Sequence, residues 1–370
     1  MRRNLIVRLF GGLVVLWLSL SSLAFGPPKL VESDTGDFPI YGADLQLISE
    51  SAPPKQMGTA ELIMDEATGK VVYQRNANNR VAPASTTKIM TAIVALEQGN
   101  LTDTITITND HMVEGSIMGL LPGDVVTLED LLWGLLLPSG NDAALAIADL
   151  VGKGSVEYFV FLMNEKVAEL GLQDTNFTNP HGLDEDGHYS SAYDLAVMGR
   201  YAMSKPVFAE MVATQRKVVQ ANRTLILDNT NQLLRQQGLN VKVGGIKTGF
   251  TENAGDCLVA AVERNGRQMI IVVMGSQGRV QAAKQLADYA FSNFTWVPLR
   301  PPLVSGATGA DGSRLPVEPY LWEMTPLWQR YYVNSAVFLE KKAPDNRLGT
   351  ATYTVGGVPV AEIGLYARAP

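Results

Sequence analysis

The sequence predicts a mixed α/β (α+β) protein in which an antiparallel sheet packs with a helical cluster and a small β domain follows. Strand-like hairpins lie at both ends of the main body, the second around the turn dipeptide Asn265-Gly266, while apolar residues at helical spacing fill the middle. Strand-like stretches return at residues 352–355 and 358–365, beyond a cluster of prolines. We therefore expect a main domain over residues 56–297 and a C-terminal β domain over residues 298–370.

The N-terminal residues have the layout of an export signal. Three arginines within the first eight residues precede an apolar run, and small residues follow it in the pattern of a cleavage site. This predicts a signal peptide over residues 1–24, followed by a proline-rich spacer over residues 25–55. The alternative is an uncleaved N-terminal anchor, although the apolar run is short for a spanning helix of roughly 17–25 residues. Both readings predict an exported protein of the cell envelope, periplasmic or secreted, that touches the membrane only through this segment if it is uncleaved.

Composition narrows the classes of function. Hydrophobic residues make up 46% of the 370 residues and charged residues 18%, as in a folded protein with a sizeable core. The net charge is −7 and no long run of Lys and Arg occurs, so we expect no nucleic-acid partner. Cys257 is the only cysteine, so no intrachain disulfide can form, and its apolar neighbours predict a buried strand position.

The elements of the main domain follow from local pattern. We expect it to open with a hairpin over residues 60–64 and 71–73, followed by a helix from residue 89 that stops at Gly99. Thr127, with Asp130 three residues on, has the pattern of a capping box, and the wide apolar band that follows predicts a central helix. Further elements are expected as a helix over 155–170, strands over 258–262 and 269–274, and a helix over 280–294.

Three short motifs appear once each and in a fixed order. They are Ser85-Thr86-Thr87-Lys88, Ser139-Gly140-Asn141 and Lys247-Thr248-Gly249. The first two stand at predicted helix starts and the third stands beside a predicted strand. Each motif alone could be ordinary structure, namely a helix cap with a solvated lysine, a turn before a helix and a strand end. Their joint occurrence favours a constructed site.

The residue types in these motifs suit acyl transfer. A serine and a lysine three apart at a helix start lie on one face, so a neutral amine can take the hydroxyl proton of Ser85. Lys88 would be neutral if burial and a nearby positive charge, such as that of Lys247, lowered its pKa. Backbone N–H groups at the helix start can stabilise an oxyanion. Ser139 can relay a proton, and the Asn141 amide can hold a substrate peptide group.

Together with their flanks, the motifs resemble the low-molecular-mass penicillin-binding proteins that act as D-alanyl-D-alanine carboxypeptidases. The similarity spans about residues 56–297, and the C-terminal β segment resembles the second domain of that family. The segments that carry it are Pro83-Ala84-Ser85-Thr86-Thr87-Lys88-Ile89-Met90-Thr91, Leu137-Pro138-Ser139-Gly140-Asn141-Asp142-Ala143-Ala144, Asn179-Pro180-His181-Gly182-Leu183, Ser191-Ala192-Tyr193-Asp194-Leu195-Ala196, Asn229-Thr230-Asn231 and Gly245-Ile246-Lys247-Thr248-Gly249-Phe250-Thr251.

The resemblance implies a β-lactamase/transpeptidase-like fold and a serine-type D-Ala-D-Ala carboxypeptidase that acts on peptidoglycan stem pentapeptides. Ser85 would form an acyl-enzyme with the penultimate D-Ala and expel the terminal D-Ala, while Lys88 acts as base. Ser139 and Asn141 would line the other wall of the site. β-Lactams would acylate the same serine as covalent inhibitors, and no cofactor is required.

The resemblance also implies how the substrate is held. Lys247 and Thr248 of the Lys-Thr-Gly motif, which ends at Gly249, would meet the substrate carboxylate. The backbone amides of Ser85 and Phe250 would form the oxyanion hole. Arg279 corresponds to an additional carboxylate-binding arginine of the family.

Other functions stay open on the sequence alone. A D,D-endopeptidase would use the same scaffold, and a β-lactamase would share all three motifs. A class A β-lactamase also needs a deacylating glutamate in a Glu-x-x-Leu-Asn pattern, which does not occur between the second and third motifs. A non-catalytic wall-binding module would be expected to lose the serine or lysine of the first motif. The cluster of His181, Asp184, Asp186 and His188 matches no tetrahedral zinc spacing, so we expect no metal site.

Overall fold

A computed structural model describes Ala52, residues 54–299 and four strand segments at 321–326, 333–339, 347–355 and 358–366. The predicted signal peptide and nearly all of the predicted spacer lie outside these residues. The helices are η1 (Ala84–Thr87), α2 (Lys88–Gln98), η2 (Asn109–His111), α3 (Leu128–Leu136), α4 (Asn141–Val151), α5 (Val156–Glu169), α6 (Ala192–Met203), α7 (Pro206–Ala213), η3 (Gln232–Arg235) and α8 (Arg279–Asn293). No helix among the described residues is both long enough and apolar enough to cross a membrane.

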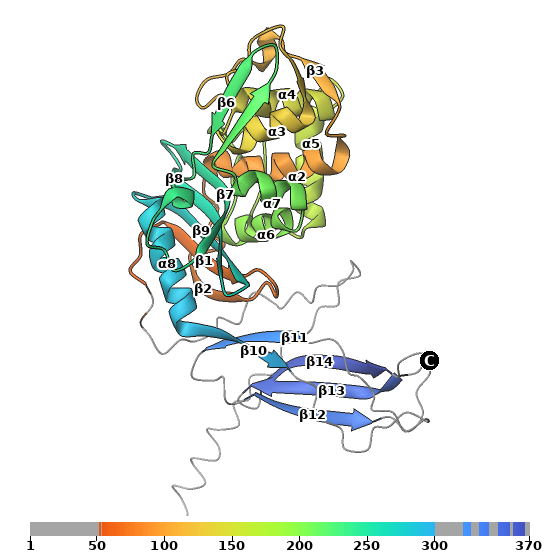
Figure 1. Cartoon of the computed structure of the whole chain (residues 1–370), viewed down its shortest axis with the longest axis vertical. Helices are drawn as coiled ribbons and strands as arrows, with labels where there is room; N and C mark the ends of the chain where they lie inside the picture. The colour runs from red at the N-terminus through yellow and green to blue at the C-terminus, as the bar shows by residue number, and fades with distance from the viewer. Residues whose placement is uncertain are drawn as a thin grey trace, which may run out of the picture. The chain divides into compact units, whose positions relative to one another are not determined.

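An antiparallel sheet of five strands forms the centre of the main body, in the order β2-β1-β9-β8-β7 (Figure 1). Its strands are β1 (Ala60–Asp65), β2 (Val71–Arg75), β7 (Lys242–Thr251), β8 (Gly255–Arg264) and β9 (Arg267–Ser276). The hairpin expected at residues 60–73 is confirmed as β1 and β2. Asn265 and Gly266 join β8 to β9, both at positive φ, as the tight turn of a hairpin requires.

The two faces of the sheet carry separate cores. Alternate residues along β8 point to opposite sides, as the two-residue period of a strand dictates. Val259 and Ala261 pack with the cluster of α2 to α7, whereas Leu258 and Ala260 pack with α8. Figure 1 shows the helical cluster on one side of the sheet and α8 on the other. β7 is the last strand of this sheet and pairs only with β8. Its other edge faces the helical cluster.

The helices predicted from pattern are confirmed, with small shifts of their ends. Thr127 caps α3 through a capping box with Asp130, and the apolar band of α3 is buried. The sequence analysis did not place α6, α7 or two minor two-stranded sheets. These sheets are β3 (Thr104–Thr106) with β4 (Val125–Thr127), and β5 (Arg216–Gln220) with β6 (Thr224–Asp228).

Two C-terminal strands, β13 (Arg347–Val355) and β14 (Val358–Tyr366), lie where the sequence predicts them, whereas β11 (Leu321–Pro326) and β12 (Val333–Leu339) were not predicted. A three-stranded antiparallel sheet contains β12, β13 and β14, and it belongs to a compact unit of its own. The other unit holds all the remaining elements, including β10 (Phe294–Leu299) paired with β11. Strand pairing thus runs through residue 298, where the sequence analysis draws the boundary, and that division stays a prediction.

Candidate active site

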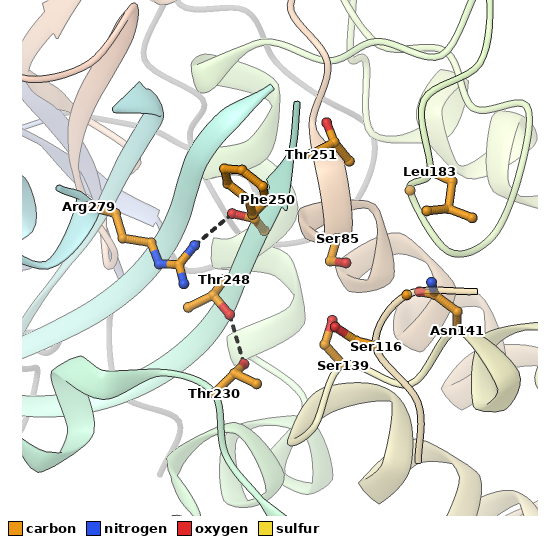
Figure 2. Close-up of a pocket in the computed structure, with 13 residues that line it drawn as sticks. Ser85, Ser116, Ser139, Asn141, Leu183, Thr230, Thr248, Phe250, Thr251 and Arg279 are labelled. Atoms are coloured by element: carbon orange, nitrogen blue, oxygen red, sulfur yellow. Dashed lines mark hydrogen bonds between the residues drawn. The ribbon is translucent and has the colours of Figure 1, made fainter. Parts of the chain in front are cut away.

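The three sequence motifs meet at one pocket of about 390 Å³ between β7 and the helical cluster (Figure 2). All the predicted site residues except the two lysines line it, and the lysines are buried. The lining residues are Ser85, Gly115, Ser116, Ser139, Asn141, Gly182, Leu183, Thr230, Thr248, Gly249, Phe250, Thr251 and Arg279. A larger hollow of about 540 Å³ lies at Gln215, Arg216, Asp228 and Arg235, but its charged groups already pair with each other.

Ser85 and Lys88 are brought together by the short helix η1 and the first turn of α2. The Lys88 Nζ atom lies 2.9 Å from Ser85 Oγ, 2.6 Å from Asn141 Oδ1 and 2.6 Å from the backbone oxygen of His181. The two carbonyl oxygens can only accept hydrogen bonds. A neutral amine has two N–H groups for them, which leaves its lone pair facing the Ser85 hydroxyl. The arrangement therefore suits proton transfer from Ser85 to Lys88.

The surroundings of Lys88 favour this neutral form. Its side chain is fully buried. Burial, followed by the positive charge of Lys247, lowers the pKa of Lys88 well below its ordinary value, against a smaller opposing effect of Asp142. None of the three atoms that Nζ contacts carries a negative charge. These surroundings suit Lys88 to act as a base toward Ser85.

The second motif forms the opposite wall, where α4 begins at Asn141 as expected. The Asn141 side chain is held at both ends, because Oδ1 accepts from Lys88 and Nδ2 donates to the Glu114 backbone oxygen at 2.7 Å. Ser139 differs: its Oγ is buried and has no hydrogen-bond partner among the residues that the structure describes. A buried hydroxyl without a partner is costly. Ser139 is therefore available to a group that enters the pocket.

The third motif lies on β7, where a β-bulge sets the direction of the Lys247 side chain. The register with β8 shifts between Val243 and Gly245, and the following Ile246 has φ +102°. Bulges of this kind redirect a side chain next to active sites. Lys247 consequently points into the protein, where its Nζ donates to the Thr248 backbone oxygen at 3.0 Å. Burial and the charge of Arg279 lower the pKa of Lys247 to about 7.

Backbone strain marks all three motifs. Non-glycine residues rarely adopt positive φ, and such residues gather at functional sites. Ala84, directly before the serine of the first motif, has φ +49°, and Ser139 itself has φ +67°. Ile246, directly before the lysine of the third motif, is the most extreme, because it is β-branched. The surrounding fold must hold these conformations.

Phe250 and Arg279 complete the strand side of the pocket. The Phe250 side chain is 58% exposed at the pocket mouth. Arg279 is the first residue of α8, and its Nη1 donates to the Gly249 backbone oxygen at 2.8 Å (Figure 2). The same Nη1 donates to Asp256 Oδ1 at 2.7 Å. The structure thus brings Arg279 to the site, as expected, but engages it with protein groups.

The sequence analysis missed several lining residues. Thr230 was quoted only within the resemblance, yet its Oγ1 lies 2.8 Å from Thr248 Oγ1. Gly182 has φ +88°, and a Cβ there would lie 2.0 Å from the Ala84 backbone oxygen. The glycine was a usable signal, since it permits this close approach. Ser116 had no signal, because its loop reaches the site only through tertiary contacts.

The two clustered histidines have structural roles. The Nδ1 atom of His188 accepts from the Thr178 backbone N–H at 3.1 Å, so its Nε2 carries the proton toward Thr87 Oγ1 at 2.8 Å. Burial lowers the pKa of both His181 and His188 to about 4, which keeps them neutral. Within the described part of the chain, no group of three or more His, Cys, Asp or Glu side chains could hold a metal ion. Burial also raises the pKa of Cys257 to about 11.

Comparisons with curated proteins reveal close relatives. A family model described as D-alanyl-D-alanine carboxypeptidase matches residues 48–278. The chain is 38% identical over 282 residues to the D-alanyl-D-alanine carboxypeptidase DacF of Bacillus subtilis (strain 168), which covers 70% of this chain and 71% of that protein. It is 41% identical over 255 residues to DacA of Escherichia coli (strain K12), which covers 65% of this chain and 62% of that protein.

Solved structures share the fold. Penicillin binding protein 5 from Haemophilus influenzae has a TM-score of 0.72 at 30% identity, covering 86% of this chain and 98% of that chain. Penicillin binding protein 6B from Escherichia coli has a TM-score of 0.70 at 31% identity, covering 86% and 97%. The expected β-lactamase/transpeptidase-like arrangement of helices and antiparallel sheet is confirmed by these likenesses. On its family match and its relatives, the chain belongs to the D-alanyl-D-alanine carboxypeptidase family of serine peptidases.

Proposed function

We propose that this protein removes the terminal D-alanine from peptidoglycan stem pentapeptides through an acyl-enzyme on Ser85. The observation that carries the proposal is the position of Lys88 Nζ, 2.9 Å from Ser85 Oγ and otherwise bound to two carbonyl oxygens. This leaves one direction in which a neutral amine can accept a proton, and that direction leads to the nucleophile.

The proposed reaction has two halves. Ser85 Oγ attacks the carbonyl carbon of the penultimate D-Ala, and its proton passes to Lys88. The tetrahedral intermediate collapses with cleavage of the C–N bond, and the departing amine of the terminal D-Ala takes a proton, for which the unpartnered Ser139 hydroxyl is a suitable relay. Water then attacks the ester, releases the shortened peptide and restores the Ser85 hydroxyl.

The strand side supplies the groups for substrate binding. We assign the free terminal carboxylate to Lys247, Thr248 and the guanidinium of Arg279. Thr248 and Arg279 line the pocket, and Lys247 is buried next to Thr248 with its charge near that of Arg279. The Ser85 and Phe250 backbone amides are the proposed oxyanion hole. Asn141 is assigned to holding Lys88 as well as to the substrate peptide group.

The test compares three substrates with purified protein. A stem pentapeptide ending in D-Ala-D-Ala, cross-linked muropeptide dimers and penicillin are each incubated with wild type, Ser85→Ala and Lys247→Ala. Release of D-Ala from the pentapeptide is the expected major reaction, and intact-protein mass spectrometry should show one penicillin adduct that Ser85→Ala lacks. Lys247→Ala should lose mainly the free-carboxylate reaction, because a site built for that group discriminates strongly against its absence.

Two outcomes would redirect the assignment. Dimer cleavage faster than D-Ala release would indicate an endopeptidase, and rapid penicillin turnover would indicate a β-lactamase. A penicillin adduct that persists in Ser85→Ala would remove Ser85 as the nucleophile.

Export and domain organisation remain part of the proposal. We assign residues 1–24 to a cleaved signal peptide, residues 25–55 to a spacer, residues 56–297 to the catalytic domain and residues 298–370 to a separate β domain. The charged, apolar and small-residue order of the N-terminus supports the first assignment. Mass determination of the protein recovered from the cell envelope tests it, since a retained N-terminal segment would indicate an anchor.

A further inference from the structure

Arg279 reaches the active site from behind the strand that carries the third motif. Its Nη1 donates to the Gly249 backbone oxygen at 2.8 Å. That oxygen belongs to the same peptide group as the Phe250 N–H, which is assigned to the oxyanion hole. In a trans peptide the C=O and N–H point in opposite directions. The carbonyl of this peptide faces Arg279 at the start of α8, so its N–H points the opposite way, and Phe250 lines the pocket on the edge strand β7.

Asp256 holds the same guanidinium. Its Oδ1 accepts from Arg279 Nη1 at 2.7 Å, and the two side chains are only 28% and 22% exposed. Asp256 lies directly opposite Phe250 in the ladder between β7 and β8. Its pairing with β9 is irregular just after this residue, which marks a bulge that can turn the carboxylate toward Arg279. The carboxylate, the guanidinium and the Gly249 carbonyl therefore form one chain of contacts.

We propose that Arg279 is a positioning residue of the oxyanion hole and that Asp256 anchors it there. A charge-assisted hydrogen bond to the Gly249 oxygen fixes the Gly249–Phe250 peptide plane and polarises it, so that the Phe250 N–H becomes a better donor to the oxyanion. This rests on the proposed acyl-enzyme at Ser85. It adds to carboxylate binding a role for Arg279 that does not require the substrate to carry a carboxylate.

The test separates these two roles by the choice of substrate. One substrate is an acylated peptide ending in D-Ala-D-Ala with its free carboxylate, and the other is a D-alanyl thioester with an uncharged leaving group. The variants are Arg279→Gln, Asp256→Ala and the milder Asp256→Asn, which keeps an acceptor oxygen for Arg279. Arg264→Gln is the matched control, because Arg264 also donates to a backbone oxygen, that of Asn240 at 2.9 Å, but at the far end of β8.

The proposal predicts a loss on both substrates. Removing an oxyanion-hole donor outright costs about 10²–10³ in kcat, so loss of its positioning by Arg279→Gln should lower kcat on the uncharged thioester by about tenfold. KM for the thioester should change little. Asp256→Ala should lower kcat severalfold, Asp256→Asn should restore most of it, and Arg264→Gln should match wild type. Rates are normalised to the fraction of protein that forms a penicillin adduct, which removes any effect of misfolded protein.

Three results would overturn the proposal. Thioester turnover by Arg279→Gln at the wild-type rate would show that Arg279 only binds the carboxylate. Wild-type kcat in Asp256→Ala would remove Asp256 as the anchor, and an equal loss in Arg264→Gln would indicate a general structural effect. Failure of the proposed function would look different, because the wild-type protein would then turn over neither substrate or would form no adduct at Ser85.

Discussion

The two walls of the active site each bury a lysine, yet they prepare the two side chains for opposite tasks. On the helical wall, Lys88 is in contact only with neutral oxygen atoms, one of which is the hydroxyl of Ser85, the proposed nucleophile. On the strand wall, Lys247 has a pKa of about 7 and stands near Arg279, whose charge is shared with Asp256. One lysine is thus available as a neutral base and the other can carry charge for an anionic substrate. Both amines contact neutral oxygen atoms, and burial is the largest cause of the lowered pKa of each. The comparison teaches that position separates their roles, because Lys88 lies against the Ser85 hydroxyl and Lys247 lies beside Arg279.

The walls also differ in how they are held. The helical wall depends on a loop, since the His181 backbone oxygen binds Lys88 and Gly182 packs against Ala84. The strand wall depends on the sheet, through the β7 bulge and the Arg279 contact from α8. Changes to the first wall should therefore affect proton transfer, and changes to the second should affect substrate binding and oxyanion stabilisation.

The largest difference between the two walls is expected when each lysine is replaced by arginine. Lys88→Arg keeps the charge but offers no neutral amine, because arginine does not deprotonate in proteins. Penicillin acylation should fall by about 10²–10⁴, as on losing a general base. Lys247→Arg keeps the charge that the strand wall uses and should lose much less. Stopped-flow acylation rates decide this, and equal losses in the two variants would mean that Lys88 is no base.

A single methyl group should disturb the helical wall. Gly182→Ala places a Cβ 2.0 Å from the Ala84 oxygen, whereas Gly238→Ala, at φ +73°, has no neighbouring atom within 4 Å. In both variants alanine must adopt a left-handed backbone conformation, which lowers the free energy of unfolding by about 1–3 kcal/mol. Only Gly182→Ala should also shift Lys88, and misplacement of about 1 Å can cost about 10²-fold in rate. Thermal unfolding and acylation rates measured side by side test this; parallel effects at both glycines would contradict it.

The dependence of kcat/KM on pH should report the protonation of Lys247 in the strand wall. Protonated Lys247 is expected to bind the carboxylate, and this form is lost as pH rises through its pKa of about 7. The kcat/KM for a free-carboxylate peptide should therefore fall above that pH by up to about tenfold per pH unit. At low pH, turnover of this peptide and of an uncharged thioester should both decrease, because Lys88 becomes protonated. An uncharged thioester should lack the alkaline fall. The same fall with both substrates would assign it to another group.

The smallest expected effect is at Thr230, which lines the pocket and contacts the hydroxyl of Thr248. Thr230→Val keeps the shape but removes the hydroxyl that lies 2.8 Å from Thr248 Oγ1. A neutral hydrogen bond contributes about 0.5–1.5 kcal/mol, so KM for the pentapeptide should rise by about 2–10-fold with kcat unchanged. Thr230→Ser keeps the hydroxyl and should behave as wild type. A fall in kcat instead of a rise in KM would place Thr230 in the chemical step.

The sequence by itself determined the local chemistry of this protein. Residues a few positions apart fix a capping box at Thr127, a hairpin turn at Asn265-Gly266 and the one-turn spacing of Ser85 and Lys88. These depend on backbone propensity and on side chains that reach their neighbours along the chain. For the same reason the three motifs could be recognised, and the predicted site residues gather in the structure.

Only the tertiary structure decided which atoms complete the site. Asn141 and His181 reach Lys88 from positions 53 and 93 residues away, and Arg279 reaches Gly249 across 30 residues. No local pattern encodes such contacts, because they follow from the packing of the helical cluster and α8 on opposite faces of the sheet. The positive φ of Ile246 could not be predicted from the sequence either, since a β-branched residue avoids that conformation unless the surrounding fold enforces it. Local sequence determines which residue types form the site. Long-range packing determines their protonation states and the directions of their side chains.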